Sequence, residues 1–181
     1  MRSYWYPIGY SDTVPSGVPY AMKLLGDPLV LFRDSEGTVH CLADLCPHRS
    51  TKLSKGSIRL EAGGVIECLY HGWQFQGATG QCVRIPSLPP EDGHTTHKVV
   101  KAIAYPCIEK LGTIWVWPGD PQFADPKKIP SDWFWDKNDT NENQGKFVKN
   151  QAIRELDIDH ELMVENLTDP AHLPFTHVGT L

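Results

Sequence analysis

The chain has 181 residues, of which 40% are hydrophobic, and this length suits one compact domain with part of another. Its 17 Lys and Arg against 22 Asp and Glu give a net charge of −5. Since there is no basic block, we expect no nucleic-acid partner. No apolar run approaches the roughly 18 residues of a membrane span, and the first residues lack the apolar stretch of a signal peptide. Five cysteines, an odd number, suit a reducing compartment, and the expected location is the cytoplasm.

Short runs of apolar and β-branched residues, each bounded by turn residues, predict a mainly β fold in residues 20–117. Tight turns such as Gly26-Asp27 are typical of antiparallel strands in a small barrel or sandwich. The expected strands cover residues 20–25, 29–32, 38–42, 65–68, 99–105 and 112–117.

The composition changes after Pro118 to proline, aspartate, asparagine and lysine, which predicts a connecting segment that crosses a surface. Farther on, Asp159 is the expected N-cap of a helix, with Glu161 in its first turn. The chain stops at Leu181 in what resembles a new layer of structure, so we expect a longer protein to continue it. The expected regions are a β-domain over residues 1–120, a connection over 121–150 and the beginning of a second domain over 151–181.

Two short segments each pair a cysteine with a histidine. They are Cys46-Pro47-His48 and Cys68-Leu69-Tyr70-His71, and each follows a predicted strand. Core cysteines beside surface histidines would explain them, and so would a structural zinc site, although zinc fingers usually pair like with like. One thiolate and one imidazole in each segment also suit two metals side by side. A [2Fe-2S] centre in which two His replace two Cys on one iron has this donor set.

The two segments closely resemble the cluster loops of the Rieske domains of ring-hydroxylating and related oxygenases, and they read Cys46-Pro47-His48-Arg49 and Cys68-Leu69-Tyr70-His71-Gly72-Trp73. The resemblance covers about residues 4–117 and implies an antiparallel Rieske β-domain. It implies that Cys46 and Cys68 hold one iron of a [2Fe-2S] cluster. It also implies that His48 and His71 hold the other iron.

A second group of candidate ligands lies near the C-terminus, in the run Asp169-Pro170-Ala171-His172-Leu173-Pro174-Phe175-Thr176-His177. A helix cap at Asp169 and two incidental histidines would explain this run. On a regular helix, His172 and His177 would lie about 140° apart and could not share a metal. However, Pro174 lies between them and bends or ends a helix, which would let the two imidazoles converge.

Within the resemblance, this D-x-x-H-x4-H motif supplies His172 and His177 as ligands of a mononuclear non-haem Fe(II). Asp169 corresponds to the carboxylate that hydrogen-bonds a cluster histidine of a neighbouring subunit and links the two metals. Such an iron site needs two His and one carboxylate, and in the family the carboxylate lies well downstream of this run. We therefore expect residues 151–181 to be the truncated start of an α+β catalytic domain, and the chain to be inactive alone.

The resemblance implies an oxygenase component that passes electrons from the cluster to the Fe(II), where O2 is activated to oxidise an organic substrate. The opening Trp5-Tyr6-Pro7 and the run that begins at Asp169 look most like the pheophorbide a oxygenase and chlorophyllide a oxygenase group. Substrates of that group are tetrapyrroles, and its members also occur in plastids, which gives an alternative location.

The implied partners are a ferredoxin or a flavin reductase as electron donor, a small organic substrate with O2, and further copies of the chain in a homotrimer. The alternative is a stand-alone Rieske ferredoxin that only carries electrons. A zinc-stabilised β-domain that mediates contacts is a third interpretation.

Overall fold

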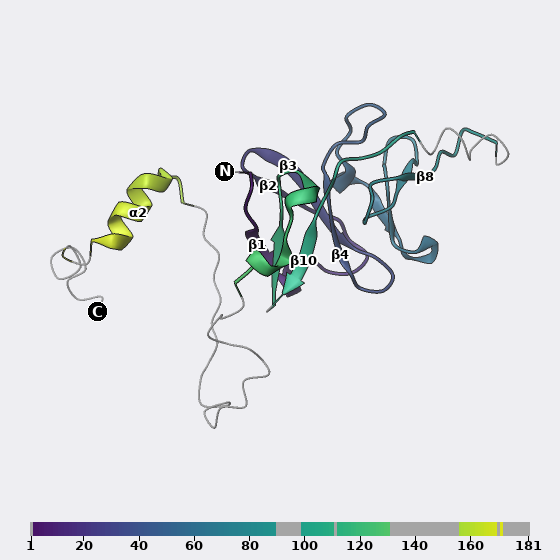
Figure 1. Cartoon of the computed structure of the whole chain (residues 1–181). Coiled ribbons are helices and arrows are strands. Elements are labelled where there is room, and N and C mark those ends of the chain that lie inside the picture. The colour runs from purple at the N-terminus through teal and green to yellow at the C-terminus, as the bar shows by residue number, and fades with distance from the viewer. Residues whose placement is uncertain (1, 90–98, 111, 131–155, 170, 172–181) are drawn as a thin grey trace, which may run out of the picture. The chain divides into compact units, whose positions relative to one another are not determined.

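The computed structural model describes residues 2–89, 99–110, 112–130, 156–169 and 171 (Figure 1). The chain divides into two units, Met1–Glu142 and Asn143–Leu181. The described part of the first unit is built from short antiparallel strands, and the described part of the second contains a helix. The predicted mainly β fold is thereby confirmed.

The strands of the described residues form three sheets. The first has the strand order β2-β3-β4-β9 and separates two hydrophobic cores. Its strands are β2 (Tyr20–Leu24), β3 (Asp27–Arg33), β4 (Val39–Ala43) and β9 (Ala104–Tyr105). Side chains alternate between the two faces of a strand. Along β3, Leu29 and Leu31 therefore belong to one core, and Val30 and Phe32 belong to the other. The run 29–32 is apolar throughout because both faces of β3 are covered.

A second sheet, with the order β5-β6-β7-β8, completes one of these cores. It contains β5 (Ser57–Arg59), β6 (Val65–Glu67), β7 (Gln74–Phe75) and β8 (Cys82–Arg84), and the 3-10 helices η2 (Leu53–Lys55) and η3 (Leu60–Ala62) precede β5 and β6. Ile58, Ile66 and Phe75 from this sheet share the core with Val30 and Phe32. In Figure 1, β8 lies on the side of β4 away from β1.

The third sheet joins the two ends of the β-domain in the order β1-β11-β10. Its strands are β1 (Tyr6–Tyr10), β10 (Cys107–Lys110) and β11 (Thr113–Val116), and η1 (Ser11–Thr13) follows β1. Two more 3-10 helices, η4 (Pro121–Phe123) and η5 (Pro126–Lys128), come next. After them, Ile129 is 1% exposed and packs with Trp5, Trp115 and Trp117. The predicted connection at 121–150 therefore begins with residues that pack on the β-domain.

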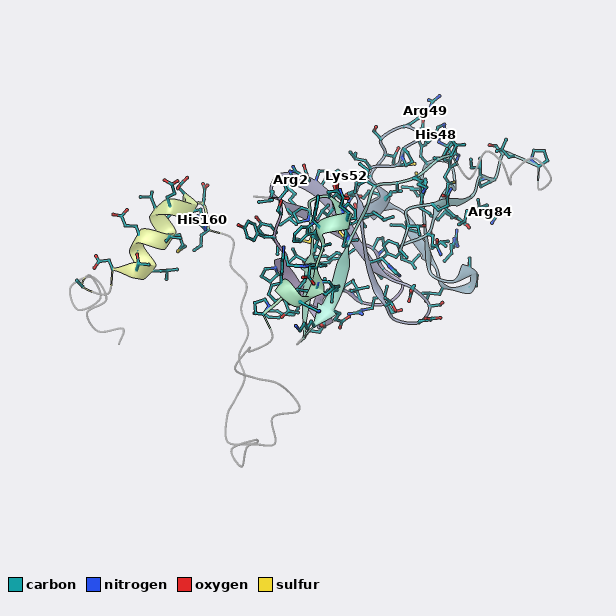
Figure 2. The ribbon with its side chains drawn as sticks, viewed as in Figure 1. Arg2, His48, Arg49, Lys52, Arg84 and His160 are labelled. Atoms are coloured by element: carbon teal, nitrogen blue, oxygen red, sulfur yellow. The ribbon has the colours of Figure 1, made fainter. Side chains whose placement is uncertain are left out.

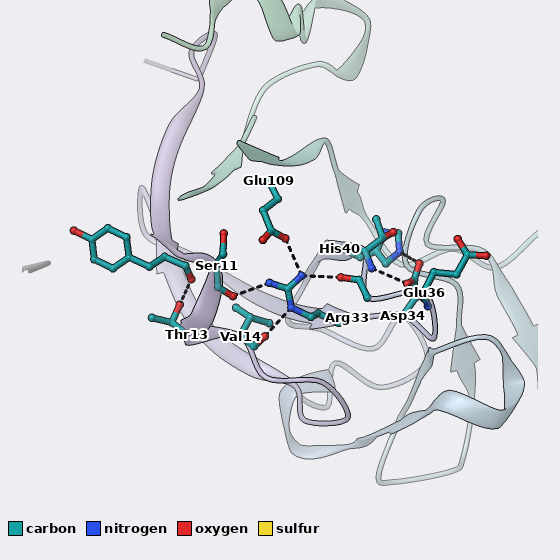
Figure 3. A network of polar contacts seen from close by, with 11 residues as sticks. Ser11, Thr13, Val14, Arg33, Asp34, Glu36, His40 and Glu109 are labelled. Atoms are coloured by element: carbon teal, nitrogen blue, oxygen red, sulfur yellow. Dashed lines mark hydrogen bonds and ion pairs between the residues drawn. The ribbon is translucent and has the colours of Figure 1, made fainter. Parts of the chain in front are cut away.

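Arg33, at the end of β3, fixes the segment that comes after β1 (Figure 3). Its guanidinium donates hydrogen bonds to the carbonyl oxygens of Ser11 at 2.6 Å, Val14 at 2.9 Å and Gly37 at 2.7 Å, and to the carboxylate of Glu109 at 2.8 Å. The hydrogen bond from Arg33 lowers the pKa of Glu109. One planar cation thus ties β3 to β10 and to the N-terminal segment.

The strand predicted at residues 99–105 is shorter in the structure, where only Ala104–Tyr105 forms β9. The preceding residues divide their backbone hydrogen bonds between two sheets. Val100 accepts a hydrogen bond from β8, whereas Ile103 accepts one from β4. Because the segment changes its partner after three residues, it forms no continuous ladder with either neighbour, and hydrophobic pattern alone does not reveal such a change.

The described part of the second unit contains α2 (His160–Thr168). Asp159 is its N-cap and accepts a hydrogen bond from the backbone N–H of Glu161 at 2.8 Å, as the sequence predicts. Among the described residues, no helix has the length and apolar character needed to span a bilayer.

Candidate metal centre

The two cysteine–histidine segments form loops beside the second sheet. The first loop (residues 46–51) comes after β4 and leads into η2, and the second loop (residues 68–73) connects β6 to β7. The four predicted cluster ligands therefore lie on two loops beside the same sheet. Both loops contribute their cysteine to the core that the first and second sheets enclose.

Both loops are closed by the same pair of backbone hydrogen bonds. The N–H of each cysteine donates to the carbonyl oxygen five positions later, at 2.8 Å. The N–H four positions later donates back to the cysteine carbonyl, at 2.8 Å in the first loop and 2.9 Å in the second. The residue at that fourth position has a left-handed backbone in both cases, with φ of +55° at Ser50 and +68° at Gly72. The protein thus uses one backbone design twice.

At Gly72 the left-handed backbone coincides with a close contact. A Cβ atom on Gly72 would lie 3.0 Å from Cγ of Pro86, in the segment after β8. That segment therefore packs directly on the second loop. Glycine suits this position because it adopts positive φ without cost and leaves room for the proline.

The two cysteines lie inside the protein and the two histidines lie at its surface. Cys46 and Cys68 are each 2% exposed. The rings of His48 and His71 are exposed, and their centroids lie 4.6 Å apart with the ring planes at 59°. Figure 2 shows His48 together with Arg49 at the outer end of the first loop. The structure thus brings together an inner pair of sulfurs and an outer pair of imidazoles.

The sulfur of Cys46 receives polar contacts from its own loop. Burial is the main reason that the pKa of Cys46 rises to about 11, and the neighbouring Cys68 thiol adds to the rise. Hydrogen bonds from the backbone N–H groups of His48 and Arg49 act in the opposite direction. These N–H groups would stabilise a thiolate, and a metal that binds here would displace the thiol proton.

Each histidine ring has an aromatic neighbour from the second loop. Trp73 stacks on His48, with centroids 4.4 Å apart and planes at 4°. Tyr70 lies 4.0 Å from His71, with planes at 40°. Partial desolvation lowers the pKa of His48, and the nearby His71 and Arg49 lower it further. A lowered pKa favours the neutral imidazole, which is the form that binds metals.

A buried carboxylate anchors the first loop. Asp44 is 2% exposed and lies two residues before Cys46. It accepts hydrogen bonds from the backbone N–H and the hydroxyl of Ser54, each at 2.7 Å. These bonds hold η2 against the end of β4, so both ends of the loop are fixed. Sequence reasoning missed Asp44 and its contact with Ser54, because an aspartate and a serine ten positions apart form no recognisable pattern.

A chain of side chains anchors the second loop. Gln74 comes directly after the loop, is 5% exposed and donates a hydrogen bond to Glu67 at 2.6 Å. Glu67 directly precedes the loop and also pairs with Arg59 of β5. The hydrogen bond from Arg59 lowers the pKa of Glu67. These contacts join the two ends of the loop, and they too carry no sequence signal.

The other three cysteines, Cys41, Cys82 and Cys107, pack against apolar residues. Cys41 and Cys82 are each 1% exposed, and Cys107 is half-buried. Burial raises the pKa of Cys41 and of Cys82, and it raises the pKa of Cys107 to about 12. Thiols with raised pKa values are poor nucleophiles and stay protonated at neutral pH.

Only part of the C-terminal motif belongs to the described residues. Asp169 is the C-cap of α2, and its carboxylate accepts a hydrogen bond from the backbone N–H of Ala171 at 3.0 Å. His172 and His177 lie outside the described residues. Their convergence on an iron stays a prediction.

The geometry of the two loops fits the group that the sequence predicts. Two adjacent buried thiols and two adjacent imidazoles are the donor set of a Rieske centre. The family described as Rieske [2Fe-2S] domain matches residues 4–106. The chain belongs to the Rieske [2Fe-2S] domain family. In this Rieske domain β1 pairs with β11, so the fold extends beyond the matched residues to Val116.

Curated relatives match nearly the whole chain. Protein TIC 55, chloroplastic, from Arabidopsis thaliana is 39% identical over 179 residues, which cover 97% of this chain and 30% of that protein. Chlorophyllide a oxygenase, chloroplastic, from Chlamydomonas reinhardtii is 36% identical over 187 residues, which cover 99% of this chain and 25% of that protein. The chain thus spans less than a third of the length of these two relatives.

Solved structures agree with this assignment. The crystal structure of apo dicamba monooxygenase has a TM-score of 0.61 to this chain and is 36% identical to it. The superposition covers 71% of this chain and 36% of that structure. The Rieske domain described above therefore has the fold that such an oxygenase contains.

Proposed function

We propose that a Rieske domain over residues 1–120 holds a [2Fe-2S] cluster, with Cys46 and Cys68 on the inner iron and His48 and His71 on the outer iron. The observation that carries this proposal is the pair of identically closed loops, each with a buried sulfur and an exposed imidazole. When bound, such a cluster accepts and releases one electron. The exposed histidines leave the outer edge of the site accessible to a partner.

We propose further that this domain is the electron-accepting part of a longer Rieske oxygenase. Residues 121–150 would connect it to a catalytic domain that begins at residues 151–181. In that domain His172 and His177 would bind a mononuclear Fe(II), and Asp169 would link this iron to a cluster histidine of a neighbouring subunit. With a carboxylate from outside this chain as third ligand, such an iron supplies O2 activation. The similarity to two relatives over 97–99% of the chain, well past residue 106, supports this proposal.

The partners are inferred from the same proposal. We infer that a ferredoxin or a flavin reductase donates the electrons, that O2 and an organic molecule are the substrates, and that the whole protein assembles as a homotrimer. The relative named chlorophyllide a oxygenase supports a tetrapyrrole as the organic substrate. The chloroplast names of both relatives support a plastid location, and a cytoplasmic location is the alternative.

A second candidate is a Rieske ferredoxin that carries electrons without chemistry of its own. The observation that favours it is that all four proposed cluster ligands lie in the first unit. The two candidates differ in the protein sequence expected downstream of the Rieske domain. A coding sequence that continues past Leu181 into a sheet with a suitable Asp or Glu would support the oxygenase, and a stop codon there would support the carrier.

The test of the ligand assignment is a comparison of two histidine variants. The chain is reconstituted anaerobically with iron and sulfide, and its iron, sulfide, zinc and visible absorption are measured. We expect His71→Ala to abolish the cluster spectrum and His172→Ala to leave it intact, because only the first lies in a cluster loop. Equal loss in both variants would contradict the two-site proposal. A colourless wild type with one zinc per chain would overturn the cluster itself.

A further inference from the structure

We propose that Trp73 is the positioning residue of His48: it stacks on the imidazole and holds it in the orientation in which it binds the outer iron. The inference rests on the proposed cluster ligands and adds a residue that binds no metal. Trp73 belongs to the second loop and His48 to the first, so a side chain of one loop would control a ligand of the other.

The indole of Trp73 is held on a rigid part of the fold. The backbone carbonyl of this residue closes the second loop by accepting the hydrogen bond from Cys68 N–H at 2.8 Å. The next residue, Gln74, is 5% exposed, begins β7 and is fixed by its hydrogen bond to Glu67. The side chain of Trp73 is half-buried and packs against the core below the loops. Trp73 therefore presents a fixed aromatic surface to the first loop.

Apart from Trp73, the imidazole of His48 has one aromatic neighbour, His71, whose ring lies 4.6 Å away, is tilted by 59° and is itself exposed. His48 lies at the exposed tip of the first loop, and among the described residues no side chain or backbone group forms a hydrogen bond with its ring. Metal-binding histidines usually donate their second ring N–H to such a partner, which fixes the ring. Parallel stacking at 4.4 Å and 4° supplies the missing restraint, because it opposes rotation of the ring away from the plane parallel to the indole.

Tyr70 provides an internal comparison. It also lies against a histidine, with 4.0 Å between its centroid and that of His71. However, Tyr70 is 57% exposed, is tilted by 40°, and directly precedes His71 in the chain. An exposed neighbour on the same turn moves with the histidine and cannot restrain it. Tyr70 is therefore the matched control: an aromatic residue beside a proposed ligand, without the geometry of a fixed stack.

A positioning role and a packing role predict different results. If Trp73 only fills space, its replacement lowers the stability of the fold and leaves the bound cluster spectroscopically unchanged. If Trp73 orients His48, its replacement lets the imidazole rotate and leave the iron more often. The energy of one aromatic stack corresponds to about a two- to tenfold change in the rate of that loss.

The experiment uses the whole chain loaded with its cluster. Wild type, Trp73→Leu, Trp73→Phe and Tyr70→Leu are transferred to bathophenanthroline disulfonate, and the rate of cluster loss is followed by visible absorption. The g values of the reduced cluster are measured by electron paramagnetic resonance. The unfolding temperature is recorded in parallel, so that loss of fold is distinguished from loss of ligand orientation.

We expect Trp73→Leu to lose its cluster about two- to tenfold faster than the wild type and to show shifted g values. Trp73→Phe, whose smaller ring covers less of the imidazole, is expected to fall between the two, and Tyr70→Leu to match the wild type. Wild-type rates and g values in Trp73→Leu would overturn the proposal, and so would equal rates in Trp73→Leu and Tyr70→Leu.

Two further outcomes are decisive. If Trp73→Leu lacks native circular dichroism, Trp73→Phe is compared with Tyr70→Phe: faster loss in the tryptophan variant supports the proposal, and equal loss overturns it. A wild type that binds no cluster would refute the proposed function itself. A wild type that binds a cluster as firmly as every variant would refute only the role of Trp73.

Discussion

The first and second loops share one backbone design, yet they are fixed to the protein in different ways. The first depends on Asp44, a carboxylate that is 2% exposed and accepts two hydrogen bonds from Ser54. The second depends on Gln74 and on the Glu67–Arg59 ion pair, whose side chains are 17% and 45% exposed. The first loop is thus held by two hydrogen bonds to one buried carboxylate, and the second by a buried amide together with an ion pair that water reaches.

This difference has an energetic consequence. Removing the acceptor from a buried contact leaves donors without partners, and each such donor costs more than the hydrogen bond contributed. An exposed ion pair contributes little, because water and salt compete for both charges. The first loop should therefore respond strongly to the loss of its carboxylate, and the second loop should respond weakly at its ion pair and more strongly where its backbone is crowded.

The largest effect is expected for Asp44→Ala. The substitution leaves the N–H and the hydroxyl of Ser54 without an acceptor inside the protein, which should lower the free energy of unfolding by about 3 kcal/mol. Chemical denaturation of the loaded chain measures this loss. Ser54→Ala, which removes only one of the two donors, should lower it by about 1 kcal/mol. A loss below that of Ser54→Ala would show that Asp44 does not anchor the loop.

The next largest effect is expected for Gly72→Ala in the second loop. The new Cβ atom would meet Pro86 at 3.0 Å on a residue with φ of +68°, and strain of this kind costs about 1–3 kcal/mol. Gly63→Ala is the matched control, because Gly63 has φ of +81° and no atom within 4 Å of its Cβ position. The difference between the two variants in denaturation isolates the contact with Pro86. If both lose equal stability, that contact is unimportant.

A smaller effect is expected at Glu67, and it should depend on pH. Arg59 lowers the pKa of Glu67 below its usual value of 4.5. A lowered pKa in the folded state stabilises the fold above pH 4.5, and this stability is lost as the pH falls through the folded-state pKa. Glu67→Gln should therefore be less stable than the wild type at neutral pH, by less than Asp44→Ala.

The two proteins should converge as the medium becomes acidic, because protonated Glu67 no longer pairs with Arg59. Unfolding temperatures measured across the acidic range, with and without added salt, test this expectation. A constant difference between wild type and Glu67→Gln at every pH would mean that the pair does not stabilise the loop through its charge.

Much of the centre could be predicted from sequence, because its ligands lie in local patterns. Cys46 and His48 are two positions apart, and Cys68 and His71 are three positions apart, so each pair is visible without knowledge of the fold. The helix cap at Asp159 is local in the same sense, since its hydrogen bond reaches only two residues ahead. Features that depend on residues close together in the chain can therefore be predicted from the sequence.

The rest of the centre depends on contacts between segments that fold back on each other. Asp44 meets Ser54 only because η2 returns to the end of β4. Trp73 stacks on His48 only because the two loops lie side by side. For the same reason the hydrophobic pattern predicts too long a β9, because the neighbours of this segment change from one sheet to another. No periodicity or spacing encodes these placements.

The smallest effect is expected for Ser50→Gly in the first loop, and it completes the comparison with Gly72. Ser50 has the same left-handed backbone, with φ of +55°, but carries an ordinary side chain. Glycine would relieve the strain of that backbone, which stabilises the fold. It would also give the unfolded chain more conformational freedom, which destabilises the fold, so the two effects oppose each other. The free energy of unfolding should change by less than about 0.5 kcal/mol. A gain in stability well above this value would mean that the left-handed backbone of the loop is strained. A near-neutral Ser50→Gly together with a destabilising Gly72→Ala would mean that the second loop needs glycine because Pro86 crowds it.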